Sequence, residues 1–275
     1  MKNSTRGSVD PFIVMDVMEA ARQLEASGRH IIHMEVGQPS SSAPKEALEA
    51  LGQKMSVDPM GYTVALGLPE LRHKIADLYD KWYGVSLNPE RVVVTSGSSA
   101  AFLLSFTSLF DSGDKVGIGA PGYPSYRQIL KSVGLCPIDI ETSAENRYQP
   151  VSCDLIGRDL AGLLVASPAN PTGTMLSKEA MRDLMITCQT MNAAFISDEI
   201  YHGIEYEKKA VTALEISDQC YVINSFSKYF SMTGWRIGWI VVPKEHVRIV
   251  ERIQQNMFIC ASHASQIVAL GAFEN

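Results

Sequence analysis

From residue 91 onward, short apolar segments alternate with amphipathic segments of helical period. The apolar segments cover residues 91–95, 115–119, 135–140, 163–166, 193–197, 221–224 and 237–242. The segments between them repeat apolar residues at helical spacing, and the clearest case follows Ser177, a residue suited to cap a helix. Apolar strands separated by amphipathic helices predict an α/β fold, with a mostly parallel sheet between two layers of helices in an α/β/α sandwich.

The N-terminal third carries two further helical patterns. Asp10-Pro11 reads as an N-cap followed by a proline in the first helical turn, and Gly28 supplies the stop. A loop rich in Gly, Pro and Ser covers residues 37–44. Pro69 opens a second amphipathic helix, which carries one apolar face formed by Leu71, Ile75, Leu78 and Trp82.

Composition excludes several classes of protein. The 275 residues are 46% hydrophobic, which is enough for a sizeable core and excludes a disordered chain. With 24 basic and 30 acidic side chains, the net charge of −6 argues against binding to nucleic acid or to an anionic membrane surface. No apolar run approaches the roughly 18 residues that span a bilayer, and the polar start lacks a signal core. We therefore expect a soluble, cytoplasmic protein.

Cysteine and histidine spacing gives no sign of a metal site or a disulfide framework. The five cysteines lie far apart without a C-x-x-C pair, so each is expected to be a small buried hydrophobe. The six histidines show no metal-ligand spacing. We therefore expect no bound metal.

Polar residues that follow the apolar strands are the candidates for chemistry, because ligands of such sheets bind beyond the carboxyl ends of the strands. Residues 96–99, Ser-Gly-Ser-Ser, join a strand to a helix, so their N–H groups can hold an anion, although a plain turn explains them as well. Asp198 follows another strand, where a buried carboxylate either caps a helix, forms an ion pair or holds a cation in a cleft.

Two basic residues flank the last predicted strands. Lys228 comes just after the strand at 221–224, and Arg236 lies between two apolar residues ahead of the strand at 237–242. An arginine in apolar surroundings needs an anionic partner, and a phosphate matches the fork of its guanidinium group. Taken singly, Lys228 is equally well read as a surface charge and Arg236 as a structural ion pair.

Taken together, these segments resemble a known family. Residues 225–238, Ser-Phe-Ser-Lys-Tyr-Phe-Ser-Met-Thr-Gly-Trp-Arg-Ile-Gly, resemble the lysine signature of the class I/II aminotransferases, which use pyridoxal 5′-phosphate on fold type I. Asn-Pro-Thr-Gly at 170–173 and Asp-Glu-Ile-Tyr at 198–201 match two further landmarks in order, and residues 61–72 resemble an upstream segment. The resemblance implies an N-terminal helix and substrate-side segment over 1–45 and a large cofactor-binding domain over 46–275.

The resemblance also assigns catalytic roles. It implies that Lys228 forms the internal aldimine with pyridoxal phosphate and later moves the proton between the substrate Cα and the cofactor. Asp198 would pair with the pyridinium nitrogen and keep the ring an electron sink. Tyr201 and Asn170 would hydrogen-bond the ring hydroxyl oxygen, and Tyr123 would stack on the ring face.

The remaining roles concern the phosphate, the substrate and a second subunit. The resemblance implies that Tyr62 reaches the phosphate of the neighbouring subunit, so that the protein is a homodimer. Gly37, and with it Asn170, would contact the substrate, an amino acid or a 2-oxo acid, while His202 has no assigned part and is read as structural or rim. The groups expected to hold the phosphate within the subunit are Gly97, Ser98, Ser99, Ser225 and Arg236.

The sequence departs from the family pattern at its end. The family continues into a smaller C-terminal domain carrying an arginine that binds the substrate carboxylate, whereas this sequence ends at Gly-Ala-Phe-Glu-Asn over 271–275. No residue can be assigned that role. The expectation is therefore a pyridoxal-phosphate-dependent aminotransferase that binds its cofactor but has impaired turnover unless a partner supplies the missing part.

Two alternatives remain open from the residues. A fold type I C–S lyase would use the same cofactor, but such lyases usually diverge around residues 234–238. A cofactor-binding domain without catalysis would fit the short chain, but the intact Lys228, Asp198 and Tyr201 speak against it. The donor amino acid is not specified, because the Ser98-Ser99 loop offers no cation for a distal carboxylate and gives no support for a dicarboxylate substrate.

Overall fold

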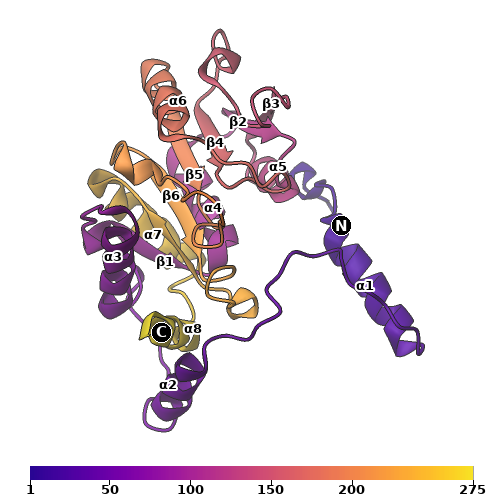
Figure 1. Ribbon diagram of the computed structural model, residues 1–275, viewed down its shortest axis with the longest axis vertical. Helices are drawn as coiled ribbons and strands as arrows, with labels where there is room; N and C mark the ends of the chain where they lie inside the picture. The colour runs from indigo at the N-terminus through magenta and orange to yellow at the C-terminus, as the bar shows by residue number, and fades with distance from the viewer. Residues whose placement is uncertain (275) are drawn as a thin grey trace.

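A seven-stranded sheet forms the centre of the computed structural model, which describes residues 1–274 (Figure 1). The strand order is β1-β7-β6-β5-β4-β2-β3. β7 runs antiparallel to both of its neighbours, and all other neighbouring strands are parallel. The predicted mostly parallel sheet is thus confirmed, and the strands are β1 Val92–Thr95, β2 Lys115–Ala120, β3 Cys136–Glu141, β4 Gly162–Ala166, β5 Ala194–Asp198, β6 Tyr221–Ser225 and β7 Gly238–Val241.

Helices cover both faces of the sheet, because successive strand residues alternate between two apolar cores. In β4, for example, Leu163 packs into one core and Leu164 into the other. The first core is covered by α3 (Pro69–Tyr83), α6 (Lys178–Thr190) and α8 (His263–Gly271). The second is covered by α4 (Gly97–Leu109), α5 (Pro124–Ser132) and α7 (Val247–Met257). This arrangement is the expected α/β/α sandwich.

Local signals in the sequence fix the ends of two covering helices. Pro69 occupies the first turn of α3, and Gly84 ends that helix in the left-handed conformation, at φ 67°. The predicted cap of α6 is also confirmed, since the Ser177 side chain accepts a hydrogen bond from the N–H of Ala180. These caps hold the helices at fixed positions over the sheet.

The N-terminal helices differ most from expectation. α1 (Ile13–Ala26) begins at Ile13, not at Pro11, because the Asp10 backbone and carboxylate hydrogen-bond the Gln128 side chain on α5 instead of capping a helix. α1 extends away from the rest of the chain (Figure 1), and Ile13 of its apolar stripe is 67% exposed. α2 (Lys45–Met55), which the sequence pattern did not single out, packs on α8 with Ala47 fully buried.

The five cysteines differ in burial, and Cys260 is intermediate. Cys188 and Cys220 are buried, as expected, whereas Cys136 and Cys153 are exposed. Cys136 is exposed because it begins β3, the edge strand of the sheet. The expectation of burial is therefore wrong for these two residues. Within residues 1–274, each helix is too short or too polar to cross a membrane.

Candidate active site

A cavity of about 540 Å³ opens at the carboxyl ends of the parallel strands. It lies where the topology of an α/β sheet places ligands. Nine of the residues predicted for the site line it: Gly37, Ser98, Ser99, Tyr123, Asn170, Asp198, Tyr201, Lys228 and Arg236. Segments far apart in the sequence therefore meet at one place, and the cavity is the candidate active site.

Asp198 is the buried acid of this cavity. It is the last residue of β5, not the residue after that strand, and its side chain is 4% exposed. Burial raises the pKa of Asp198 to about 6, because the charged carboxylate is poorly solvated there. The hydroxyl of Tyr126 and the N–H of Ile200 donate hydrogen bonds to its two oxygens. Both donors are neutral, so a cationic group in the cavity would complete the environment of this carboxylate.

Tyr126 is a site residue that the sequence pattern did not reveal. It follows Tyr123 by three residues near the start of α5, and this spacing places both rings on one face of the helix. Their ring centroids are 5.3 Å apart in an edge-to-face arrangement, and both residues line the cavity. The helical spacing from Tyr123 is the signal that could have identified Tyr126.

Lys228 brings an amine into the cavity. Its Nζ donates a hydrogen bond to the carbonyl oxygen of Gly37 at 2.5 Å and lies 5.7 Å from the centroid of the Tyr201 ring. Burial lowers the pKa of Lys228, and the nearby charge of Arg236 lowers it further. A lysine whose pKa is lowered presents more of its neutral, nucleophilic form.

Arg236 lies over the start of α4, where glycine leaves room for its guanidinium group. Gly97, the first residue of α4, has a φ of +75°, and a Cβ built there would lie 2.6 Å from Nη2 of Arg236. Nη1 of Arg236 donates to the carbonyl oxygen of Thr233 at 2.8 Å, which fixes the plane of the group. Because the N–H groups of a helix start and a guanidinium group both attract anions, this corner of the cavity is suited to a phosphate.

Gly238 allows β7 to approach this corner. A Cβ at Gly238 would lie 2.8 Å from the carbonyl oxygen of Asn224 and 3.2 Å from the backbone nitrogen of Ser98. A side chain there would push β7 away from β6 and from the start of α4. The two glycines thus bring the strand, the helix start and Arg236 into close contact.

Asn170 and Tyr201 meet in the cavity from the segments that follow β4 and β5. Nδ2 of Asn170 donates to the hydroxyl of Tyr201 at 3.3 Å. Burial raises the pKa of Tyr201, so its hydroxyl stays protonated and able to donate. The pair therefore offers polar donors from two different loops at one place in the cavity.

Three predicted site residues lie outside the lining of the cavity: Gly97, which lies behind the Arg236 guanidinium group, Ser225 and Tyr62. Ser225 is buried, and its hydroxyl donates to the carbonyl oxygen of Ile237 and contacts the hydroxyl of Ser227. Ser227 lines the cavity in its place. Tyr62 is 84% exposed and borders a separate hollow of about 420 Å³.

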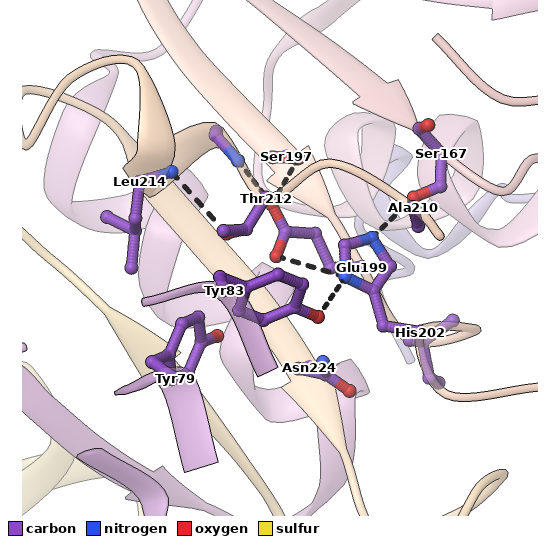
Figure 2. Close-up of polar contacts among 12 residues, drawn as sticks. Tyr79, Tyr83, Ser167, Ser197, Glu199, His202, Ala210, Thr212, Leu214 and Asn224 are labelled. Atoms are coloured by element: carbon purple, nitrogen blue, oxygen red, sulfur yellow. Dashed lines mark hydrogen bonds and ion pairs between the residues drawn. The ribbon is translucent and has the colours of Figure 1, made fainter. Parts of the chain in front are cut away.

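His202 belongs to the interior and not to the rim, since only 1% of it is exposed. It forms part of a buried polar cluster with Glu199 and Tyr83 (Figure 2). In the part of the chain that the structure describes, no group of three or more His, Cys, Asp or Glu side chains is arranged to hold a metal ion.

Comparison with known proteins agrees with this geometry. The family description "Aminotransferase class I and II" matches residues 29–274. The chain is 42% identical to a valine–pyruvate aminotransferase of Mycobacterium tuberculosis, over 98% of this chain and 70% of the relative. It thus spans about 70% of the length of that relative.

Solved structures give the same result. A structure from Silicibacter pomeroyi is 66% identical, with a TM-score of 0.93 over 100% of this chain and 71% of that one. A Mycobacterium tuberculosis aminotransferase is 41% identical, with a TM-score of 0.95 over 99% of this chain and 72% of that one. The fold is therefore fold type I, and the chain belongs to the class I and II aminotransferases, a family of pyridoxal-phosphate-dependent enzymes.

Proposed function

We propose that this chain binds pyridoxal 5′-phosphate in the cavity and transfers amino groups between amino acids and 2-oxo acids. The observation that carries the proposal is the meeting, in one cavity, of a buried acid at Asp198 and an amine of lowered pKa at Lys228. The acid suits a protonated ring nitrogen, and the amine suits a carbonyl carbon.

The residues of the cavity fit each part of the cofactor. Asp198 would hold the ring nitrogen, since both of its present donors are neutral. Arg236 and the N–H groups of Ser98 and Ser99 would hold the phosphate at the start of α4, where Gly97 has no Cβ to obstruct them. The donors that would reach the ring hydroxyl oxygen are on Asn170 and Tyr201.

When bound, the cofactor supplies an electron sink that weakens the bonds at the substrate Cα. Lys228 would transfer the proton: its neutral amine would take the proton from the substrate Cα and then, as an ammonium group, deliver it to the cofactor. The lowered pKa of Lys228 favours the neutral amine that this step needs. With its negative charge, Asp198 would hold the ring nitrogen and favour its protonated form.

The substrate and the second subunit would use residues at the edge of the site. Gly37 already accepts a hydrogen bond from Lys228, so its backbone lies where a substrate carboxylate would approach. Tyr62 is largely exposed, as expected of a residue that reaches the site of a partner in a homodimer. We also propose the division into an N-terminal segment over 1–45 and a large domain over 46–275, of which residue 275 lies outside the described residues.

Absorption spectroscopy of the purified chain tests the proposal. Pyridoxal phosphate should give a Schiff-base band that is lost in Lys228→Ala and retained in a matched control, Lys178→Ala, whose lysine begins α6 and pairs with Glu215. Adding single amino acids should shift the band in proportion to the 2-oxo acid formed. A band that survives in Lys228→Ala, or no cofactor binding by the wild-type chain, would show the proposal to be wrong.

A further inference from the structure

A polar cluster lies buried behind the cavity, in the first core of the sheet (Figure 2). It consists of Glu199 and His202, which are 0% and 1% exposed, and Tyr83, which is half-buried and borders a separate hollow. Nδ1 of His202 lies 2.5 Å from the hydroxyl of Tyr83 and 3.6 Å from Oε2 of Glu199. None of the three lines the cavity of the candidate active site, so direct contact with a ligand there does not explain them.

The ring nitrogens of His202 have different partners. Nε2 lies 2.8 Å from the carbonyl oxygen of Ser167, which can only accept a hydrogen bond, so Nε2 carries the hydrogen. Nδ1 faces the hydroxyl of Tyr83, which can donate to it. The Ser167 carbonyl therefore sets the tautomer, and Tyr83, at the end of α3, helps to fix the orientation of the ring.

Glu199 is the acidic residue of this cluster. Its Oε1 accepts hydrogen bonds from the Ser197 hydroxyl at 3.0 Å and the Ala213 N–H at 2.8 Å. Its Oε2 is buried without a hydrogen-bond partner among the described residues, and it faces His202. Burial raises the pKa of Glu199, and His202 opposes that rise. A buried oxygen left in this state is costly, which indicates that the cluster has a use beyond filling space.

The bond between His202 and Ser167 joins the two loops that carry Asn170 and Tyr201. Ser167 begins the loop after β4, three residues before Asn170. His202 belongs to the turn after β5, one residue after Tyr201. Asn170 and Tyr201 touch on the cavity side, and His202 and Ser167 touch on the buried side. The two loops are thus connected twice, once in the cavity and once behind it.

We propose that His202 is a positioning residue for the transferase site: it fixes the separation of Asn170 and Tyr201 through Ser167, and Tyr83 holds it in place beside Glu199. This inference rests on the proposed function, because it assumes that Asn170 and Tyr201 contact the ring hydroxyl oxygen. Through Tyr83, His202 would connect α3 to Asn170 and Tyr201, the two residues whose donors would stabilise the anionic form of the ring oxygen.

A matched pair of variants tests this role. Tyr83→Phe removes the hydroxyl that faces Nδ1 of His202, and His202→Leu removes the bond to Ser167. The control is Tyr221→Phe, because the hydroxyl of Tyr221 lies 3.0 Å from Nδ1 of His246 in the same way but far from the two loops. His202→Gln retains an N–H donor and serves as the conservative variant.

Three measurements separate positioning from simple stability. In the cofactor-free protein, hydrogen exchange of residues 168–173 should become faster in His202→Leu and Tyr83→Phe, and not in the control. The dissociation constant for pyridoxal phosphate should rise about tenfold in His202→Leu, as loss of about one well-placed hydrogen bond predicts, and less in His202→Gln. The pH at which the absorption band of the bound cofactor titrates should rise, since fewer donors would stabilise the anionic form of its ring oxygen.

The outcomes are distinguishable. If the wild-type chain binds no pyridoxal phosphate, the proposed function fails, whatever the exchange data show. If it binds, but His202→Leu and Tyr83→Phe match Tyr221→Phe in exchange, affinity and titration, the cluster only stabilises the fold and our inference is overturned. If Tyr83→Phe alone changes all three quantities while retaining its thermal stability, the positioning role is supported even where His202→Leu fails to fold.

Discussion

Replacing Gly97 with alanine tests the phosphate corner most directly. The Cβ of alanine would lie 2.6 Å from Nη2 of Arg236, closer than two such atoms approach, and 3.1 Å from Cζ, which is an unusually tight contact. Arg236 would have to move, and its bond to the carbonyl of Thr233 restricts where it can go. The φ of +75° adds backbone strain that only glycine avoids.

The two effects have different magnitudes and different readouts. Left-handed backbone strain should lower the free energy of unfolding by about 1–2 kcal/mol. Displacement of the guanidinium group should cost the cofactor a charge-assisted hydrogen bond worth about 1.5–3 kcal/mol, which corresponds to a rise of about 10- to 150-fold in its dissociation constant. Strain should therefore change stability, and the collision should change affinity.

Gly157→Ala is the matched control, because Gly157 has a φ of +77° but no atom within 4 Å of the position that a Cβ would take. Urea unfolding of the cofactor-free variants and titration with pyridoxal phosphate give the two quantities. Both variants should lose similar stability, and only Gly97→Ala should lose affinity. If Gly97→Ala binds as tightly as Gly157→Ala, the guanidinium group of Arg236 does not hold the phosphate, and our reading of this corner is refuted.

Two further predictions concern the stability of the cofactor-free protein. Burial raises the pKa of Asp198 from 3.8 to about 6, so the folded state binds its proton more tightly and stability falls as the pH rises through that range, by about 3 kcal/mol. Asp198→Asn should remove this component, which comparison of urea unfolding at about pH 4 and about pH 7.5 checks; an unchanged pH dependence would contradict it. Phe226 is fully buried, and its ring centroid lies 4.8 Å from that of Phe230 and 5.1 Å from that of Trp239, so Phe226→Ala should lower the free energy of unfolding by about 3–5 kcal/mol. Tyr206→Ala, at a fully exposed ring, is the control, and a loss below about 1 kcal/mol for Phe226→Ala would contradict the packing argument.

The periodicity of apolar residues was sufficient to predict the strands of the sheet and the helices that pack directly on it. α3 follows the predicted face, with Leu71 and Ile75 fully buried, and α6 begins at its predicted cap. α1 shows the limit of this signal. An apolar stripe at helical spacing indicates that the helix packs against a partner, but it does not identify the partner. Most of the apolar stripe of α1 is exposed in the single chain.

The candidate site was predictable where a residue is placed by its own strand, and not where it depends on contacts between distant segments. Asp198, Lys228 and Arg236 lie at strand ends and meet in the cavity as the pattern indicated. The bond from Tyr126 to Asp198 joins residues 72 positions apart, and no local pattern encodes it. His202 is a similar case, since its partners come from α3 and from the loop after β4.

The reversed direction of β7 determines which chain segment carries the two basic residues of the site. Every other strand has its carboxyl end at the edge of the sheet where the cavity lies, but β7 has its amino end there. This is why Arg236 precedes its strand while Lys228 follows β6. Both charged anchors therefore belong to one connection, closed at its base by the pairing of Ser225 with Gly238. A length change within that connection would move the amine and the guanidinium group relative to each other, whereas a length change in any other loop would leave their spacing intact.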